Sequence, residues 1–171
     1  MKILLIPPKS NYPSATPNIH LVPLGFPYIA AALKQHGIEM DGLTLNHIDC
    51  TRHVLKRRIR EAISYYRPDF IGVGGLSAEY LFVSDVIRVV RDCDPRIRIV
   101  LGGGIISSDP EYIMNDLKPD YGVLGDGEET IVEIVRGKER EKIKGIAFWD
   151  ERTNKSVFNE RRESTKDLDA L

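Results

Sequence analysis

The residues of this chain best placed for ligand chemistry are glycines and acids gathered in three short stretches. These stretches are GGLS (74–77), GGGIISS (102–108) and GDGEE (125–129), and each follows an apolar run. Glycine there permits unusual backbone angles, or lets a ligand touch the backbone without interference from a Cβ. Single glycines are common in turns, but turn geometry alone does not require this many. We therefore predict that one wide ligand contacts several of these stretches.

The apolar runs alternate with longer helical patterns along the chain. KILLI (2–6), IEMDGLTL (38–45), DFIGV (69–73), RIRIVL (96–101) and DYGVL (120–124) are predicted strands, and a helical pattern follows each of them. Nearly continuous apolar character is typical of strands that helices cover on both faces. The sequence predicts an α/β, three-layer, doubly wound parallel sheet of five strands, with the flavodoxin-like order 2-1-3-4-5.

In folds of this class, ligands bind beyond the carboxyl ends of the strands. All three glycine stretches are expected at that edge, together with the long first loop PPKSNYPSATPNIHLVP (7–23). From residue 138 the character changes, because GIAFW and SVFN flank the turn-forming DERTNK. We predict an α/β domain over 1–137, then a small β-hairpin and a charged linker over 138–171.

Composition excludes several classes of partner. Lys and Arg number 24 and Asp and Glu 25, so the net charge of −1 creates no global field for nucleic acid or an anionic membrane. The basic run at 52–60 lies off an apolar helical stripe and is interpreted as a solvated face. No apolar run reaches the roughly 20 residues of a bilayer span, and the start MKILLIPP does not resemble a signal peptide, so we expect a cytoplasmic location.

The ligand is not expected to be a common nucleotide. A dinucleotide would require G-x-G-x-x-G where Pro7, Pro8 and Lys9 stand, and no Walker-type loop occurs. A receiver domain would need an Asp where Gly74 and Gly75 follow the third strand. The acidic stretch at 125–129 would repel phosphate, which disfavours a flavin or nucleotide module, and it suits amide or hydroxyl donors.

Several motifs occur together in order: PLGFPYIAAALKQHG, RPDFIGVGGLS, IRIVLGGGIISS and PDYGVLGDGEE. In this combination the chain resembles, over essentially its whole length, the N-terminal cobalamin-binding domain of the B12-dependent radical SAM enzymes. The resemblance implies a flavodoxin-like fold that holds the corrinoid's nucleotide tail between sheet and helices, with the ring over the strand ends. The cofactor-binding residues that it implies are Leu24, Gly25, Gly74, Ser77, Gly102, Gly103, Gly104, Gly125, Asp126, Gly127 and Glu128.

The resemblance also implies individual roles. Ser77 would hydrogen-bond the tail, although it could instead cap the N-terminus of the helix expected over 77–93. Gly102 and Gly103 would allow close approach of the tail. The loop from Gly125 to Glu128 would face the amide side chains of the ring, where a carboxylate is a good acceptor, although Glu128 could also be only a first-turn acid.

His20 is the one residue of the first loop that could bind cobalt. The methionine-synthase type of cobalamin domain carries D-x-H-x-x-G in this loop, whereas this chain has Asn18 for the Asp and Pro23 for the Gly. Without the Asp to orient the imidazole, ligation is disfavoured. We expect cobalamin to bind with its base displaced and without a protein histidine below the cobalt, so that no residue of this chain is a metal ligand.

The rest of a radical SAM enzyme is expected outside this chain. Cys50 and Cys93 are the only cysteines, are expected to be free buried thiols, and cannot supply C-x-x-x-C-x-x-C for a [4Fe–4S] cluster. Cluster and S-adenosylmethionine would belong to a C-terminal radical SAM domain or a partner chain. No residue here is assigned a catalytic role, and the full reaction would be methyl transfer or, in some relatives, a rearrangement. The alternative is a recognition domain that keeps the fold without the cofactor.

Overall fold

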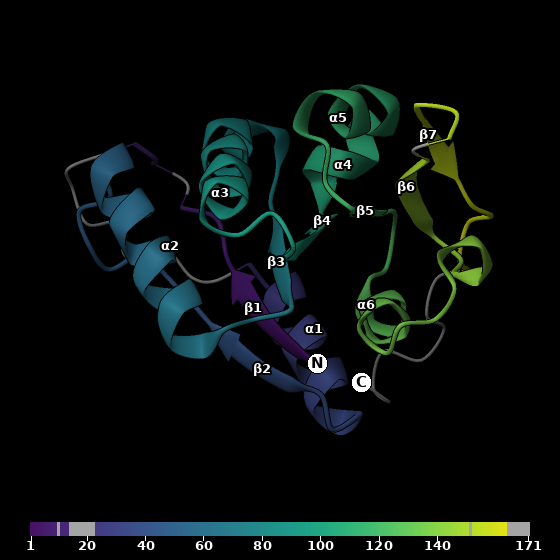
Figure 1. Cartoon of the computed structure of the whole chain (residues 1–171), viewed down its shortest axis with the longest axis horizontal. Coiled ribbons are helices and arrows are strands. Elements are labelled where there is room, and N and C mark those ends of the chain that lie inside the picture. The colour runs from purple at the N-terminus through teal and green to yellow at the C-terminus, as the bar shows by residue number, and fades with distance from the viewer. Residues whose placement is uncertain (10, 14–22, 151, 164–171) are drawn as a thin grey trace.

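The computed structural model describes residues 1–9, 11–13, 23–150 and 152–163. Its centre is one twisted sheet (Figure 1), which has seven strands. The strand order is β2-β1-β3-β4-β5-β6-β7. The strands are β1 (Lys2–Ile6), β2 (Glu39–Gly42), β3 (Phe70–Gly74), β4 (Arg98–Gly102), β5 (Tyr121–Val123), β6 (Ile146–Asp150) and β7 (Lys155–Phe158).

The first five strands are parallel, in the predicted order 2-1-3-4-5. The fold class predicted from the sequence is therefore confirmed. The C-terminal hairpin of β6 and β7 forms as expected, and β6 pairs antiparallel with β5. The hairpin thus extends the central sheet, and Phe148 on β6 is buried in the same core as the parallel strands.

Helices cover both faces of the sheet, with α2 and α3 on one side and α1 and α6 on the other (Figure 1). The helices are α1 (Gly25–Gln35), α2 (Arg52–Tyr66), α3 (Tyr80–Cys93), α4 (Gly104–Ser108), α5 (Pro110–Leu117) and α6 (Glu128–Val135). Two short 3-10 turns are η1 (Ser77–Glu79) and η2 (Arg140–Lys142).

Local signals set most helix ends. Gly37 follows α1 with φ of +67°, the left-handed conformation expected of a glycine there. The Thr51 side chain caps α2 by accepting from the backbone N–H of Val54, and the Asp109 side chain caps α5 by accepting from that of Tyr112. Helix α4 was not predicted, because its five residues GIISS were interpreted as loop.

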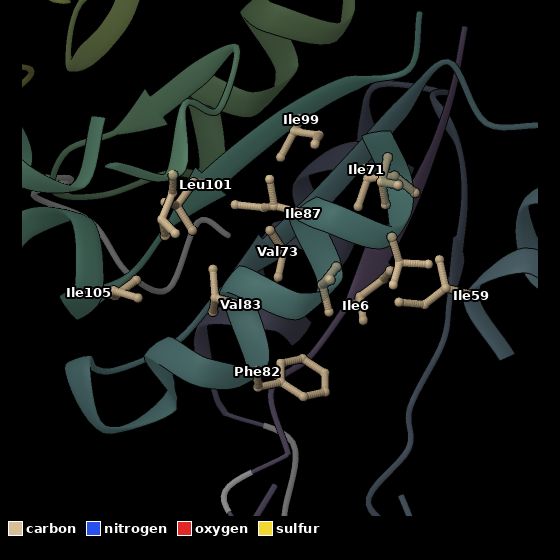
Figure 2. Packing of buried hydrophobic residues seen from close by; sticks show 14 of the residues in the cluster. Ile6, Ile59, Ile71, Val73, Phe82, Val83, Ile87, Ile99, Leu101 and Ile105 are labelled. Atoms are coloured by element: carbon tan, nitrogen blue, oxygen red, sulfur yellow. The ribbon is translucent and has the colours of Figure 1, made fainter. Parts of the chain in front are cut away.

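The face beneath α2 and α3 is closely packed with aliphatic side chains. Figure 2 shows Phe82, Val83 and Ile87 of α3 directed at side chains from β1, β3 and β4. Ile71 and Ile99 at the centre of that layer have no exposed surface. Leu55 and Ile59 are the buried part of the predicted α2 stripe, which leaves the basic residues of this helix toward solvent as expected.

Candidate functional site

A cavity of about 460 Å³ opens on the α1 and α6 face, at the carboxyl ends of the parallel strands. This is the edge at which ligands bind in doubly wound folds. Its lining is mainly apolar or backbone and comes from β1, α1, β3, β4, β5, α6 and the loops between them. The lining residues are Leu5, Pro23, Gly25, Phe26, Ile29, Gly72, Val73, Gly74, Gly75, Leu76, Glu79, Val100, Gly102, Gly103, Gly104, Val123, Gly125, Asp126, Gly127, Glu128 and Ile131.

The floor of the cavity is hollow because side chains are missing from one face of β3 and β4. Successive strand residues point to opposite faces, so Gly72, Gly74 and Gly102 all face the cavity side. Gly74 and Gly102 are direct neighbours in the pairing register of the two strands. An ideal Cβ on Gly102 would have only the Cβ of Val123 within 4 Å, at 4.0 Å, and would therefore project into open space.

Other glycines of this rim are required by the protein's own backbone. A Cβ on Gly74 would lie 2.5 Å from the carbonyl oxygen of Gly102, and one on Gly103 would lie 2.8 Å from that of Gly75. Gly103 also has φ of +83°, and the Gly75 carbonyl accepts a hydrogen bond of 2.9 Å from the N–H of Ile105. Close contact between the loops after β3 and β4 thus accounts for Gly74 and Gly103, independently of any ligand.

The charged side chains that line the cavity within the described ranges are all carboxylates, from Glu79, Asp126 and Glu128. Glu79 is half-buried and accepts a hydrogen bond from the backbone N–H of Leu76, which fixes its carboxylate against Gly75. Glu128 is the first residue of α6, where an acid is stabilised by the helix dipole. The loops at the cavity mouth therefore present hydrogen-bond acceptors.

The structure brings together most of the residues predicted from the sequence. Nine of them line the cavity: Gly25, Gly74, Gly102, Gly103, Gly104, Gly125, Asp126, Gly127 and Glu128. The Leu24 side chain is exposed and lies just before α1, outside the lining. The Ser77 hydroxyl lies 3.2 Å from that of Ser108, also outside the lining. His20 falls outside the described residues.

The alternative prediction, that Ser77 caps the N-terminus of the helix expected over 77–93, is wrong. A 3-10 turn over Ser77–Glu79 precedes α3, the residue at the N-cap of that turn is Leu76, and the one at the N-cap of α3 is Glu79. The extra turn exists because the Glu79 carboxylate satisfies the free N–H of Leu76.

The apolar floor of the cavity and the Glu79 carboxylate were not predicted from the sequence. Leu5, Gly72 and Val100 form a row across three neighbouring strands, and Phe26, Ile29 and Ile131 enclose it from α1 and α6. Period-two alternation in FIGVG (70–74) could have identified Gly72 as a partner of Gly74 on one face. Glu79 had no such signal, because its position depends on the unpredicted 3-10 turn.

A second group of polar side chains is buried beside the first loop. Lys9 is 1% exposed, and neither its Nζ nor the Oδ1 of Asn46 has a hydrogen-bond partner among the described residues. Asn46 donates from Nδ2 to the carbonyl of Pro8 at 3.3 Å. Burial raises the pKa of the Cys50 thiol, and the charge of Lys9 opposes that rise. Cys50 is buried, Cys93 is half-buried, and both are free.

The described part of the first loop is anchored by Asp85, a buried carboxylate of α3. It accepts hydrogen bonds from the Tyr12 hydroxyl at 2.7 Å and from Nε of Arg52 at 3.0 Å. The Tyr12 ring also packs edge-on against Phe82, with ring centroids 5.4 Å apart. Burial and the bond to Asp85 raise the pKa of Tyr12 above its ordinary value. The base of the loop is therefore held to the packed face of the domain.

The described ranges contain neither a cluster of metal-ligating side chains nor a helix that could cross a membrane. No group of three or more His, Cys, Asp or Glu side chains is placed to hold a metal ion. None of the helices in those ranges is both long and apolar enough to span a bilayer.

Two relatives share sequence with this chain. An uncharacterised methyltransferase of Pyrococcus horikoshii is 26% identical over 168 residues, which cover 94% of this chain and 34% of that protein. An uncharacterised protein of Methanocaldococcus jannaschii is 26% identical over 102 residues, covering 58% of this chain and 19% of that protein. This chain therefore spans about a third or less of the length of these relatives.

Two radical S-adenosylmethionine enzymes are among the solved structures that share its fold. The radical S-adenosylmethionine methyltransferase TsrM from Kitasatospora setae, solved with tryptophan substrate and an S-adenosylmethionine analogue, matches with a TM-score of 0.75 at 22% identity, over 93% of this chain and 30% of TsrM. The cobalamin-dependent S-adenosylmethionine radical enzyme OxsB, solved with aqua-cobalamin, matches with a TM-score of 0.69 at 16% identity, over 95% of this chain and 22% of OxsB.

The family comparison covers most of the α/β part of the chain. The model of the B12 binding domain matches residues 15–135, from the first loop to the end of α6. That range contains all of the strand-end loops that form the cavity except the start of the first loop. The chain therefore belongs to the B12-binding domain family.

Proposed function

We propose that this chain binds cobalamin in the cavity between the strand ends, α1 and α6, as the cobalamin-binding domain of a B12-dependent radical SAM methyltransferase. The observation that carries the proposal is the hollow floor. Gly102 leaves open space on the cavity face of β4, at the edge where doubly wound folds bind ligands, whereas the protein's own atoms require the glycines at 72 and 74. Family membership indicates which ligand such a hollow would hold.

The residues around the cavity fit the chemistry of a corrinoid. Leu5, Val100 and Ile131 offer apolar surface for a tail inserted between sheet and helices. Asp126 and Glu128 offer acceptors for the amide groups at the edge of a corrin ring. When bound, cobalamin would supply a cobalt-carried methyl group, while this chain's residues would orient the corrinoid and shield its tail from water.

The proposed binding mode has the nucleotide base displaced and no protein imidazole below the cobalt. The first loop lacks the Asp that would orient His20, and the described residues that line the cavity include no histidine. Electron paramagnetic resonance of the Co(II) form tests this mode. We expect no nitrogen superhyperfine splitting, and splitting that changes when the protein's histidines carry 15N would contradict it.

The remainder of the enzyme is proposed to lie in further sequence or in a partner chain. Residues 1–137 would form the cobalamin domain, and residues 138–171 the hairpin and connection to a radical SAM domain that holds the [4Fe–4S] cluster and S-adenosylmethionine. The methyltransferase relative, of which this chain matches 34%, supports this division. The substrate would then be selected by the radical SAM part.

The test is a titration of the purified chain with hydroxocobalamin, read by visible absorbance after gel filtration. Gly102→Leu is the blocking variant, because a side chain there enters open space without touching backbone. Gly42→Leu is the matched control, because Gly42 ends the edge strand β2 and its added Cβ also meets nothing within 4 Å. We expect the parent and Gly42→Leu to retain cobalamin, and Gly102→Leu to lose it.

A parent chain that does not retain cobalamin would contradict the proposal and favour the recognition domain without a cofactor. Equal retention by Gly102→Leu and the parent would contradict the proposed location of the site. Circular dichroism and urea denaturation of all three proteins establish that any loss comes from the cavity and not from unfolding.

A further inference from the structure

Leu76 is an exposed leucine in the lining of the cavity. It is 63% exposed, whereas Leu5, Val100 and Ile131 elsewhere in the lining are buried. Of the exposed large apolar side chains in the described ranges, Leu76 alone lines the cavity. The hydrophobic effect depends on apolar area removed from water, so an exposed leucine contributes little to folding. Leu76 therefore presents apolar surface that the fold itself leaves uncovered, beside the candidate ligand site.

The backbone around Leu76 is held from two sides. Its N–H donates to the Glu79 carboxylate, and its carbonyl accepts from the Glu79 N–H at 2.9 Å. The preceding carbonyl, that of Gly75, accepts from the N–H of Ile105 at 2.9 Å. The loop that carries Leu76 is therefore tied to η1 on one side and to α4 on the other.

The Leu76 side chain lies against the start of α4. An ideal Cβ on Gly104 would lie 3.1 Å from Cδ2 of Leu76, so the leucine occupies the space beside that glycine. Glu79 occupies the space beside Gly75 in the same way, because a Cβ there would lie 2.8 Å from Oε2 of Glu79. All four residues line the cavity. The place of Leu76 in the lining is therefore linked to a single carboxylate.

From these contacts we infer that a ligand in the cavity covers the Leu76 side chain, and that Glu79 is the positioning residue that holds Leu76 in place for it. Glu79 acts through the hydrogen bond that its oxygen accepts, so an uncharged side chain with the same acceptor can replace it. The inference rests on the proposed function, since the ligand that tests it is cobalamin. It adds to that function one apolar ligand contact and the residue that supports it.

The test measures the dissociation constant of hydroxocobalamin by ultrafiltration and visible absorbance, for the parent chain and its variants. Leu76→Ala removes the proposed contact, and Glu79→Ala removes the supporting hydrogen bond. Glu79→Gln keeps a carbonyl oxygen that can accept from the Leu76 N–H. Leu81→Ala is the control, because Leu81 is a leucine of α3 that is 38% exposed and lies outside the lining. Urea denaturation of each protein measures its stability.

We expect Leu76→Ala to weaken cobalamin binding about tenfold, because the ligand would lose the apolar area that it buries on the leucine. The urea midpoint of Leu76→Ala should not change, because this side chain is exposed in the free protein. Glu79→Ala should weaken binding about fivefold, because the loop loses the bond that holds Leu76. Glu79→Gln and Leu81→Ala should bind within about twofold of the parent.

A double variant shows whether Glu79 acts through Leu76. Leu76→Ala combined with Glu79→Ala should bind no more weakly than about tenfold below the parent, because the positioning role needs the leucine. Hydrogen exchange of the Leu76 N–H, measured without cobalamin, reports the support itself. It should be faster in Glu79→Ala than in the parent and in Glu79→Gln.

Cobalamin binding that is unchanged in Leu76→Ala would overturn the inference and leave the proposed function standing. Equal losses in Glu79→Ala and Glu79→Gln would overturn the positioning role, because Glu79 would then act through its charge. Losses that multiply in the double variant would overturn that role too, because Glu79 would then act independently of Leu76. Failure of the parent to bind cobalamin would overturn the proposed function, and this inference with it.

Discussion

The two faces of the central sheet are built from the same strands, but one face is packed core and the other lines the cavity. On the face toward α2 and α3, β3 and β4 present Ile71, Val73, Ile99 and Leu101, which are all buried and packed against α3 (Figure 2). On the face toward α1 and α6, the alternate residues at the same strand ends are glycines. Each strand therefore contributes alternate residues to the packed core on one face and to the cavity on the other.

This difference shows how a small domain can contain a cavity without losing its core. Removing side chains from both faces would leave the sheet without packing, whereas removing them from one face leaves a complete layer behind it. The cavity also lies only at the carboxyl end of its face. Further toward the amino end, Ile3, Leu33 and Phe70 on that same face are buried.

The largest expected effect comes from damage to the packed face. Ile99→Ala removes a fully buried side chain from the middle of that layer and should lower the free energy of unfolding by about 3–4 kcal/mol. Gly102→Leu on the hollow face should change it by less than about 1 kcal/mol, because the new side chain fills open space. Urea denaturation of the two variants measures the contrast, and equal losses would show that the faces do not differ.

The next largest effect is a difference in the stability lost by substituting two neighbouring glycines. Gly103→Ala should cost about 2–3 kcal/mol, because it places a Cβ 2.8 Å from the Gly75 carbonyl oxygen at a residue with φ of +83°. Gly102→Ala should cost less than about 0.5 kcal/mol. Urea denaturation of both variants is the measurement. A Gly103→Ala protein as stable as the parent would mean that the two loops separate easily and that their close contact is not needed.

The two faces also differ in how much of their structure could be predicted from the sequence. The order of the elements was predictable because buried strands appear in the sequence as apolar runs. A proline also stands just before each of β3, β4 and β5, at Pro68, Pro95 and Pro119. A glycine in the sequence shows that a side chain is absent, but the sequence does not reveal whether a ligand or the protein's own atoms occupy the space that this leaves. Gly103 was predicted to make room for a ligand, and the structure shows that the Gly75 backbone needs that space.

Helix α4 illustrates what sequence alone could not supply. It depends on contacts between the loops after β3 and β4, such as the bond from the Ile105 N–H to the Gly75 carbonyl. Such contacts form only after the strands have paired, so no local pattern reports them. The predicted glycines and acids at strand ends line one cavity because parallel pairing brings strand ends together, whereas Ser77, one turn beyond, lies beside Ser108 outside the lining.

Lys9 is the exception on the packed side of the domain, and its removal should stabilise the protein. The Lys9 ammonium is buried and has no partner in the part of the chain that the structure describes, which is costly, so Lys9→Met should raise the free energy of unfolding by about 1–2 kcal/mol. Lys155→Met, at an exposed position of β7, should have no effect. Thermal and urea denaturation measure both. A loss of stability in Lys9→Met would show that a bound water or anion satisfies the amine.

The smallest expected effect concerns the outer surface of α6, the helix that walls the cavity. Arg162 donates from Nε to the Thr130 hydroxyl at 2.9 Å and pairs with Glu129 at 2.6 Å and with Glu133. Its side chain is 16% exposed, so these contacts are only partly open to solvent. Arg162→Met should lower the free energy of unfolding by about 1 kcal/mol at pH 7.

The loss in Arg162→Met should depend on pH through Glu133. Burial opposes its ionisation, but the hydrogen bond from Lys138 and the charge of Arg162 together hold its pKa below the ordinary 4.5. A lowered folded-state pKa stabilises the protein above pH 4.5, and this stabilisation is lost as pH falls through the folded value. The gap between parent and variant should therefore narrow below about pH 4.

Urea denaturation at pH 7 and pH 3.5 measures this gap, and Lys144→Met is the matched control. Lys144 pairs with Glu160 at 3.0 Å, but both side chains are more than half exposed, so its loss should be near zero at both pH values. A gap that stays constant with pH would show that Arg162 acts through its bond to Thr130 and its packing, and not through the carboxylate of Glu133. The anchor of residues 159–163 on α6 would then be insensitive to acid.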